Sequence, residues 1–175
     1  MRFAPAPLPG AWLLEPEPAV DGRGYFARTF DRAAFAERGM AVDFAQCSVS
    51  HNARQGTLRG MHWQAAPHGE SKLILCVRGA VFDVLLDLRP DSPAYLCWFG
   101  RELRPGGTML YAPPGVAHGF LTLEDGSDVY YHITPEYHPE SSRGARWNDP
   151  AFAIAWPGEA RVVSERDASY PDWRP

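Results

Sequence analysis

Short apolar runs separated by turn residues dominate the chain from about residue 70 onward. Residues 72–78 and 80–89 are rich in Val, Leu, Ile and Phe and meet at Gly79. Further apolar runs follow at residues 95–99, 108–112, 117–123 and 129–133, with clusters of Pro, Gly, Asp and Ser between them. Strands that recur at such short intervals are typical of antiparallel sandwiches and barrels, and not of parallel α/β sheets. We therefore predict an all-β fold.

Two segments outside these runs have recognisable patterns. An alanine-rich stretch at residues 32–38 favours a short N-terminal helix, with Asp31 as its N-cap and Gly39 as its end. Toward the C-terminus, Trp156-Pro157 and Tyr170-Pro171 indicate a segment that packs back on the barrel. The 175 residues fit one domain, spanning residues 1–175.

Composition and charge narrow the class of protein. A net charge of −4 disfavours a general nucleic-acid-binding or acidic-membrane-binding surface. Three cysteines do not make a disulfide framework and suit a reducing compartment. No stretch approaches the roughly 18 apolar residues of a membrane span. We therefore expect a soluble cytoplasmic protein, with neither nucleic acid nor membrane among its partners.

One glycine motif formally matches a dinucleotide fingerprint. Residues 22–27 are Gly-Arg-Gly-Tyr-Phe-Ala, which fits the pattern G-x-G-x-x-A. Residues 15–18 alternate Glu and Pro where a Rossmann fold needs a buried strand, and no βαβ unit follows. We interpret the motif as a turn that presents Arg23 and Phe26, and not as a site for a nicotinamide dinucleotide.

Two histidines lie in separate predicted strands, His62 and His118. Metal-binding cupins also place histidines on separate strands, but they normally add a second histidine two residues after the first and a carboxylate soon after. Here position 64 is Gln and the nearest carboxylate is Glu70. A metal-dependent oxygenase or isomerase built on His62, Glu70 and His118 stays an alternative, as does a purely structural role for both histidines.

Proton transfer is the third interpretation of His62. A neutral imidazole, with a pKa of about 6.5, suits proton abstraction near neutral pH. Removing a proton from carbon also requires a cation to stabilise the enolate. The single lysine among the 17 basic residues is Lys72, in the next predicted strand. Candidates for a separate acid cluster in one late predicted strand, at Tyr130, Tyr131, His132 and Tyr137.

The order of several short motifs along the chain is distinctive. These motifs are residues 21–26, 46–50, 56–64, 72–73, 81–84, 87–89, 113–120, 147–150 and 164–167, and they include RGMHWQ, PPGVAHGF and SERD. Over roughly residues 12–170 the chain resembles the dTDP-4-dehydrorhamnose 3,5-epimerase family. The resemblance implies a cupin-type antiparallel jelly-roll barrel. It also implies an isomerase that inverts C3, C5 or both of a nucleoside-diphosphate 4-keto-6-deoxyhexose, with no metal and no organic cofactor.

The resemblance implies catalytic roles for four matched positions. His62 matches the general base that takes a proton from a carbon next to the C4 ketone. Asp167 matches the carboxylate that holds the tautomer of this histidine. Tyr131 matches the acid that reprotonates the carbon from the other face, and Lys72 matches the cation beside the C4 oxygen.

Other matched positions are expected to bind substrate. Arg59 matches the residue that holds the diphosphate. Arg23 and Phe26 match residues that reach in from the partner subunit of a strand-exchanged homodimer. Tyr137 matches a second tyrosine in the sugar pocket. The remaining positions are Gln46, Ser48, Arg28 and His118 as substrate-binding residues, and Asp83 as a supporting residue near the base.

Two positions depart from the family's pattern. Ser48 stands where the family commonly has Asn, and Arg28 stands where enzymes for the thymidine nucleotide usually have Glu. Glu can accept the N–H of thymine, whereas Arg only donates and suits acceptor edges such as that of guanine. We therefore expect GDP and CDP sugars as alternatives to dTDP sugars. A sugar-nucleotide-binding subunit without turnover also stays an alternative.

The strand that carries Arg59 and His62 poses a geometric question. Strict alternation places residues three apart on opposite faces of a strand. Both can face one site if Gly60 forms a bulge, or if Arg59 reaches in from the strand end. The sequence leaves both solutions open.

Overall fold

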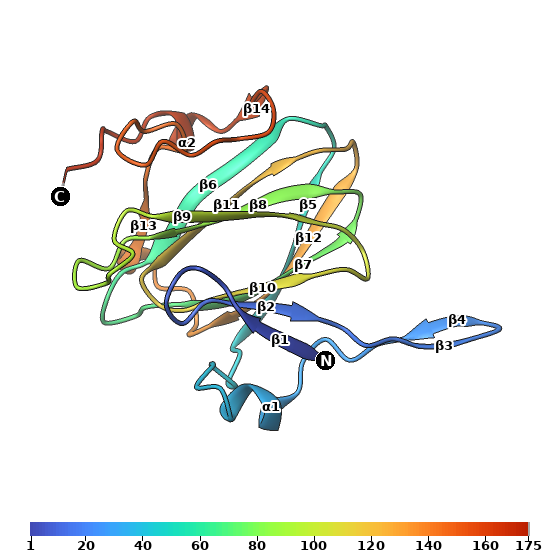
Figure 1. The fold of residues 1–175 in the computed structure, drawn as a ribbon. Coiled ribbons are helices and arrows are strands. Elements are labelled where there is room, and N and C mark those ends of the chain that lie inside the picture. Colours follow the sequence, from blue (N-terminus) through green and yellow to red (C-terminus); the bar gives the residue numbers. More distant parts are fainter. Residues whose placement is uncertain (175) are drawn as a thin grey trace.

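Two β-sheets packed face to face form the body of the protein (Figure 1). The computed structural model describes residues 1–174, and none of its helices in that range is long and apolar enough to cross a membrane. The strands are β1 (Arg2–Pro5), β2 (Trp12–Glu15), β3 (Ala19–Asp21), β4 (Gly24–Phe26), β5 (Gln46–Asn52), β6 (Thr57–Gln64), β7 (Ser71–Arg78), β8 (Val81–Asp87), β9 (Trp98–Leu103), β10 (Met109–Ala112), β11 (Val116–Thr122), β12 (Ser127–Thr134), β13 (Ser142–Gly144) and β14 (Val162–Val163). The helices are α1 (Arg32–Ala36), the 3₁₀-helix η1 (Pro139–Ser141) and α2 (Glu165–Ala168).

The strand order is that of a jelly roll. Successive strands from β5 to β12 lie in opposite sheets, except for β8 and β9, which pair in one sheet. One sheet has the order β10-β7-β12-β5 and the other the order β6-β11-β8-β9. Strands β1 and β2 extend the first sheet beside β10, and β13 and β14 pair with β6 in the second. The predicted all-β, cupin-type jelly-roll fold is therefore confirmed.

Side chains alternate along β7 between two separate apolar clusters, because successive residues of a strand point to opposite faces. Ile74 and Cys76 face the core between the sheets, while Leu73 and Leu75 face outward and pack in the same cluster as Phe35 of α1. Helix α1 thus covers the outer face of the first sheet. It is N-capped by Asp31 as predicted but ends at Ala36, two residues earlier than expected.

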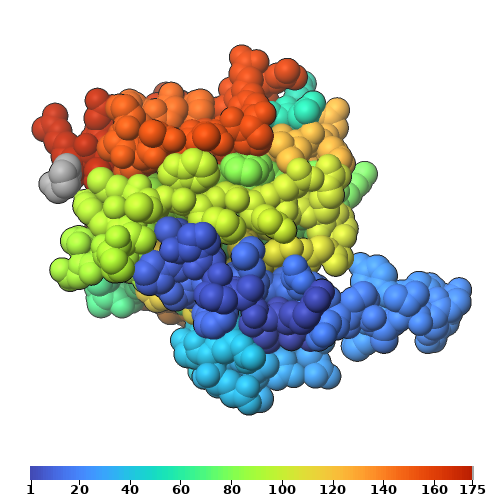
Figure 2. Space-filling model, in the orientation of Figure 1, coloured from blue at the N-terminus to red at the C-terminus, as the bar shows by residue number. Residues whose placement is uncertain are grey.

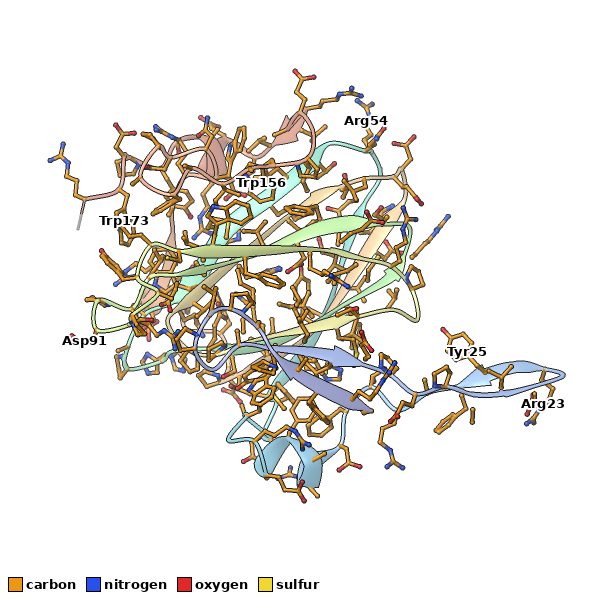
Figure 3. The ribbon with its side chains drawn as sticks, viewed as in Figure 1. Arg23, Tyr25, Arg54, Asp91, Trp156 and Trp173 are labelled. Carbon is orange, nitrogen blue, oxygen red and sulfur yellow. The ribbon has the colours of Figure 1, made fainter. Side chains whose placement is uncertain are left out.

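The C-terminal segment covers the outer face of the second sheet, as predicted (Figure 1). Val84 and Leu86 of β8 share a cluster with Phe152, Trp156 and Trp173, and the two tryptophans are labelled in Figure 3. The opposite face of β8 lies in the core between the sheets. Strand β8 is therefore buried on both faces, which explains its nearly continuous apolar sequence.

The strand predicted at residues 95–99 is wrong in its bounds, since β9 begins at Trp98 and continues to Leu103. The N–H of Tyr95 bonds to the carbonyl of Ser92, and the N–H of Cys97 bonds to that of Ala94. Leu96 between them has a φ of +63°, which is outside the extended range. These turns keep the apolar residues 95–97 out of the strand.

Strands β3 and β4 form a hairpin that projects from the body of the molecule (Figure 2). Its turn is residues 22–23, so the interpretation of the glycine motif as a turn is confirmed. The hairpin is exposed throughout, and Phe26 and Val20 are 74% and 76% exposed. Large apolar side chains therefore stand in solvent on this arm, and none of its residues belongs to the buried apolar clusters found within residues 1–174.

Candidate active site

A bulge in β6 turns Arg59 and His62 toward the same cavity. His62 is paired with His118 of β11 and Arg59 with Phe120, so a step of three residues in β6 faces a step of two in β11. The extra residue offsets the alternation of side chains. Gly60 has a φ of +137°, and a Cβ there would lie 2.6 Å from the Cα of Gly119. The bulge, one of the two predicted solutions, is confirmed.

The cavity has a volume of about 450 Å³ and lies between β6, β11, β12 and residues 162–167. It brings together residues that are more than a hundred positions apart in the sequence. Five of the predicted site residues line it: Arg59, His62, His118, Tyr131 and Asp167.

His62 and Asp167 form a hydrogen-bonded pair in this cavity. His62 Nε2 lies 2.7 Å from Asp167 Oδ1, and the backbone N–H of Gly60 donates to Asp167 Oδ2 at 3.2 Å. Burial raises the pKa of Asp167, but the hydrogen bonds from His62 and Gly60 outweigh it, so the pKa lies below its ordinary value. The ionised carboxylate can only accept, so Nε2 carries the hydrogen and Nδ1 keeps a lone pair. His62 is 38% exposed, which leaves that lone pair within reach of a ligand.

His118 forms a second pair, with Asp83 of β8, but in a buried position. His118 Nε2 lies 2.7 Å from Asp83 Oδ2, and the side chains are 6% and 0% exposed. Burial raises the pKa of Asp83 above its ordinary value, although the charges of His118 and Lys72 act in the opposite direction. Both histidines line the cavity, and His62 is the more exposed of the two.

Tyr131 stands beside His118 on the inner face of β12. Its ring is nearly perpendicular to that of His118, with centroids 5.7 Å apart. Burial, and then the charge of Asp83, raise the pKa of Tyr131 well above its ordinary value, while Arg59 acts in the opposite direction. The phenol therefore keeps its proton at neutral pH and can serve as a donor.

The other candidates for the acid do not share this position. Tyr130 and His132 alternate with Tyr131 and point to the outer face of the sheet. There the ring of His132 lies 5.1 Å from that of Tyr130 and 6.4 Å from that of Phe30, between centroids. Tyr137 lies beyond the end of β12 and is 54% exposed. The expectation that all four candidates lie in one strand is thus wrong for Tyr137. The other three lie in β12, with Tyr131 on its inner face and Tyr130 and His132 on its outer face.

Lys72 contacts the backbone of His62 but is not among the residues that line the cavity. Its ammonium donates to the carboxylate of Glu70 and, at 3.2 Å, to the backbone carbonyl of His62. The Lys72 side chain is only 9% exposed. An ammonium has three donors, so one N–H has no partner among residues 1–174.

The metal ligands considered from the sequence are engaged elsewhere. Glu70 is paired with Lys72, and each histidine is paired with its own aspartate. The side chain of Gln64 bonds to backbone groups of residues 68, 136 and 138. Within the described range these donors do not converge as one metal site would require.

A different trio of donors does gather, in two loops away from the cavity: His68, His138 and Glu140. The imidazole rings of His68 and His138 are stacked, 3.6 Å apart and within 8° of parallel. A bound ion lies in the plane of each ligating ring, and two parallel planes have no such point in common. This arrangement therefore does not present both histidines to one ion.

Gln46 and Ser48 follow the inner face of β5 next to β12. Ser48 is paired with Tyr131 and Gln46 with Ile133, so both residues continue the face that carries Tyr131. Gln46 Oε1 also accepts the backbone N–H of Tyr137 at 3.1 Å. Gln46 thus links the strand to the segment that carries Tyr137.

Three predicted site residues lie away from the cavity of their own chain. Arg23 is at the tip of the β3–β4 hairpin, paired with Asp21, and Phe26 is on the same arm (Figure 3). Arg28 donates to Asp31, the N-cap of α1, at 2.9 Å. One chain alone therefore does not bring these residues to the site.

Two further residues belong to the site although the sequence did not single them out. Arg166 lines the cavity beside Asp167, and its Nε donates to the hydroxyl of Tyr170 at 2.8 Å. Asn52 of β5 accepts from Nε of Arg59 at 2.8 Å. The signal for Arg166 was its place in the SERD motif, whose Ser164 caps α2 by accepting from the backbone N–H of Asp167. No local signal marks Asn52.

Comparisons with known proteins agree along the whole chain. The family model described as dTDP-4-dehydrorhamnose 3,5-epimerase matches residues 5–174. A protein of that name from Methanothermobacter thermautotrophicus is 42% identical over 179 residues, covering 99% of this chain and 94% of that one. The crystal structure of dTDP-4-dehydrorhamnose 3,5-epimerase from Elizabethkingia anophelis NUHP1 has a TM-score of 0.94 at 32% identity, covering 99% of this chain and 96% of that one. A dTDP-6-deoxy-D-glucose-3,5-epimerase from Legionella pneumophila, in complex with dTDP-4-keto-L-rhamnose, has a TM-score of 0.89 at 34% identity, covering 97% and 90%.

Proposed function

The chain belongs to the dTDP-4-dehydrorhamnose 3,5-epimerase family, and we propose that it inverts C3, C5 or both of a nucleoside-diphosphate 4-keto-6-deoxyhexose. The observation that carries the proposal is the His62–Asp167 pair, which opens into the same cavity as the protonated Tyr131. A proton next to a ketone is already weakly acidic. A base, a cation and an acid are therefore sufficient chemistry, and no hydride carrier takes part.

The reaction divides among three side chains. His62 Nδ1 takes the proton from C3 or C5, and the electrons of that C–H bond move to the C4 oxygen to form an enolate. Lys72 is not among the residues that line the cavity, and its ammonium, 3.2 Å from the backbone carbonyl of His62, stabilises the negative oxygen through its positive charge. Tyr131 then delivers its proton to the carbon from the opposite face and inverts its configuration. Exchange with solvent restores both groups, since the imidazolium of His62 releases a proton and the phenolate of Tyr131 takes one up. Asp167 keeps Nε2 of His62 protonated throughout and stabilises the imidazolium.

Binding is assigned to the residues around this centre. Arg59 holds the diphosphate, since an arginine can grip phosphate oxygens through two parallel N–H bonds. The sugar pocket is formed by Gln46, Ser48, Tyr137 and His118, and Asp83 supports His118 from behind. The carrier nucleotide of the relatives is dTDP. The expectation from Arg28, that GDP and CDP sugars are alternatives to dTDP sugars, stays a prediction.

Exchange with solvent tests the proposed reaction. We expect the enzyme in D₂O to place deuterium at C3, C5 or both of a dTDP-linked 4-keto-6-deoxyhexose, because the hydroxyl of Tyr131, which delivers the new proton, carries a deuteron from the solvent. NMR of the sugar shows which carbon is labelled and whether it is inverted. Tight binding without any label over many hours would instead identify a non-catalytic binding subunit.

The site of one subunit is completed, in our proposal, by the hairpin of its partner in a homodimer. Arg23 and Phe26 are far from the cavity of their own chain and stand on an exposed arm that carries apolar side chains (Figures 1 and 3). An arm of this kind gains stability by packing on a second subunit. Exchange of two arms across a twofold axis places each Arg23 beside the other subunit's diphosphate site.

Mixing two defective variants tests this exchange. Arg23→Ala and His62→Ala are each expected to have low activity as homodimers. After refolding together, about half of the dimers are mixed, and each mixed dimer regains one of its two sites, so about a quarter of the parent activity returns. Mixed dimers that form without any recovery would show that Arg23 acts within its own chain.

A further inference from the structure

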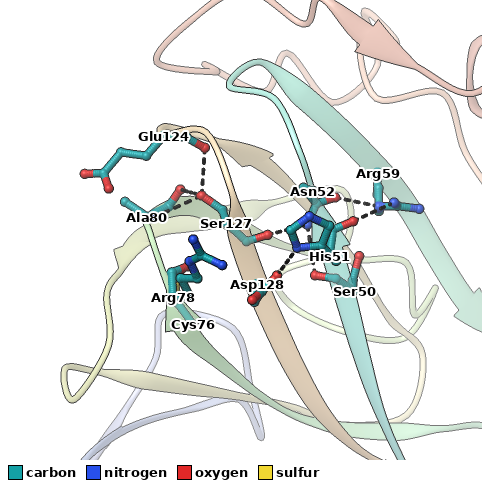
Figure 4. Close-up of polar contacts among 10 residues, drawn as sticks. All are labelled: Ser50, His51, Asn52, Arg59, Cys76, Arg78, Ala80, Glu124, Ser127 and Asp128. Atoms are coloured by element: carbon teal, nitrogen blue, oxygen red, sulfur yellow. Dashed lines mark hydrogen bonds and ion pairs between the residues drawn. The ribbon is translucent and has the colours of Figure 1, made fainter.

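The guanidinium of Arg59 is held by β5 before any ligand binds. Its Nε donates to the side-chain oxygen of Asn52 at 2.8 Å, and its Nη2 lies 3.4 Å from the backbone carbonyl of His51 (Figure 4). A guanidinium carries five N–H donors in one plane. Two of them are engaged here, so among residues 1–174 three remain without a partner, one on Nη2 and two on Nη1.

Asn52 is itself fixed in one orientation. It is 2% exposed, and its Nδ2 donates to the carbonyls of Ser50 at 3.0 Å and Ser127 at 3.1 Å (Figure 4). A flipped amide would turn its oxygen toward these two carbonyls and its NH₂ toward the guanidinium. Both contacts would then be repulsive, so the oxygen of Asn52 is directed only at Arg59.

We propose that Asn52 is a positioning residue that orients Arg59 toward the diphosphate of the substrate. This inference rests on the proposed role of Arg59 in binding that diphosphate. A neutral amide suits this role better than a carboxylate, because it fixes the plane of the guanidinium without neutralising its charge. The remaining N–H groups then meet phosphate oxygens with their orientation already set. Affinity rises when less side-chain freedom is lost on binding.

A double-mutant cycle measured by calorimetric titration tests the proposal. The ligands are dTDP and inorganic pyrophosphate, the second of which has no base to recognise. We expect Asn52→Ala to lower the affinity for dTDP and for pyrophosphate by about tenfold, the usual effect of losing one hydrogen bond to a charged group. Arg59→Ala weakens them at least as much. In the Arg59→Ala background the Asn52 substitution causes no further loss, since it has nothing left to position.

Ser127→Ala is the matched control. Its hydroxyl is buried next to Asn52 and bonds to Ala80 and Glu124, so its loss disturbs the same corner of the sheet without touching Arg59 (Figure 4). We expect this variant to lower the thermal midpoint and to bind pyrophosphate like the parent. In turnover, Asn52→Ala should raise KM and leave kcat nearly unchanged, because the diphosphate is remote from the reacting carbons.

The outcomes separate the inference from the function on which it rests. Equal losses from Asn52→Ala in the parent and Arg59→Ala backgrounds would overturn the positioning role and leave Arg59 as a ligand. Parent-like binding by Arg59→Ala would refute the diphosphate role of Arg59 itself. If Asn52→Ala does not fold, Arg59→Lys serves instead, because it keeps the charge but loses the planar fork. Undiminished affinity in Arg59→Lys would also overturn the proposal.

Discussion

Replacing His62 with alanine is expected to slow epimerisation by about 10²–10⁴-fold, the usual contribution of a positioned general base. The fold should survive, because the imidazole is 38% exposed and, within residues 1–174, forms its hydrogen bond with Asp167 alone. Deuterium exchange at the sugar carbons should fall by the same factor as epimerisation. Both rates are measured by NMR in D₂O, together with the thermal midpoint of each protein.

His68→Ala is the matched control for this substitution. It makes the same chemical change in a loop outside the cavity and should leave the rate unchanged. Asp167→Asn tests the tautomer of His62, and it should also slow the reaction strongly. The amide can donate to Nε2, which favours the tautomer with its hydrogen on Nδ1 and removes the lone pair that takes the proton. Adding Asp167→Asn to His62→Ala should cost little more, since the two residues act as a unit. Parent-like turnover by His62→Ala would remove His62 as the base.

Much of the fold was predictable because turns and apolar runs carry local information. The helix cap at Asp31 and the strands around Gly79 follow from residues a few positions apart. The covering of one face of β8 by the C-terminal segment was indicated only by Trp156-Pro157 and Tyr170-Pro171 in that segment. The start of β9 was missed, because the turn at Leu96 depends on hydrogen bonds to Asp87 across the loop.

The site was less predictable because it depends on contacts between distant strands. Motif order singled out His62 and Asp167, and the structure shows them paired. Alternation alone would have put Arg59 on the wrong face, and only the pairing of β6 with β11 shows the bulge. The pairing of Lys72 with Glu70 and of Arg59 with Asn52 has no signature in the sequence, since side-chain partners are chosen by tertiary packing.

Removing the hydroxyl of Tyr131 should separate proton abstraction from inversion. In Tyr131→Phe, His62 still takes the proton and can return a deuteron to the same face. We therefore expect epimerisation to fall by about 10²-fold while deuterium exchange with retained configuration persists. The ring that packs against His118 is preserved, so the fold should not change. The ratio of exchange to inversion, measured by NMR in D₂O, is the readout.

Tyr130→Phe is the control that makes this result specific. It removes the same hydroxyl from the preceding residue of β12, whose side chain points to the outer face of the sheet. This variant should epimerise like the parent. If Tyr131→Phe also epimerises like the parent, the acid must be another residue. Tyr137 is then the remaining candidate, because His132 lies on the same outer face as Tyr130 and cannot reach the cavity.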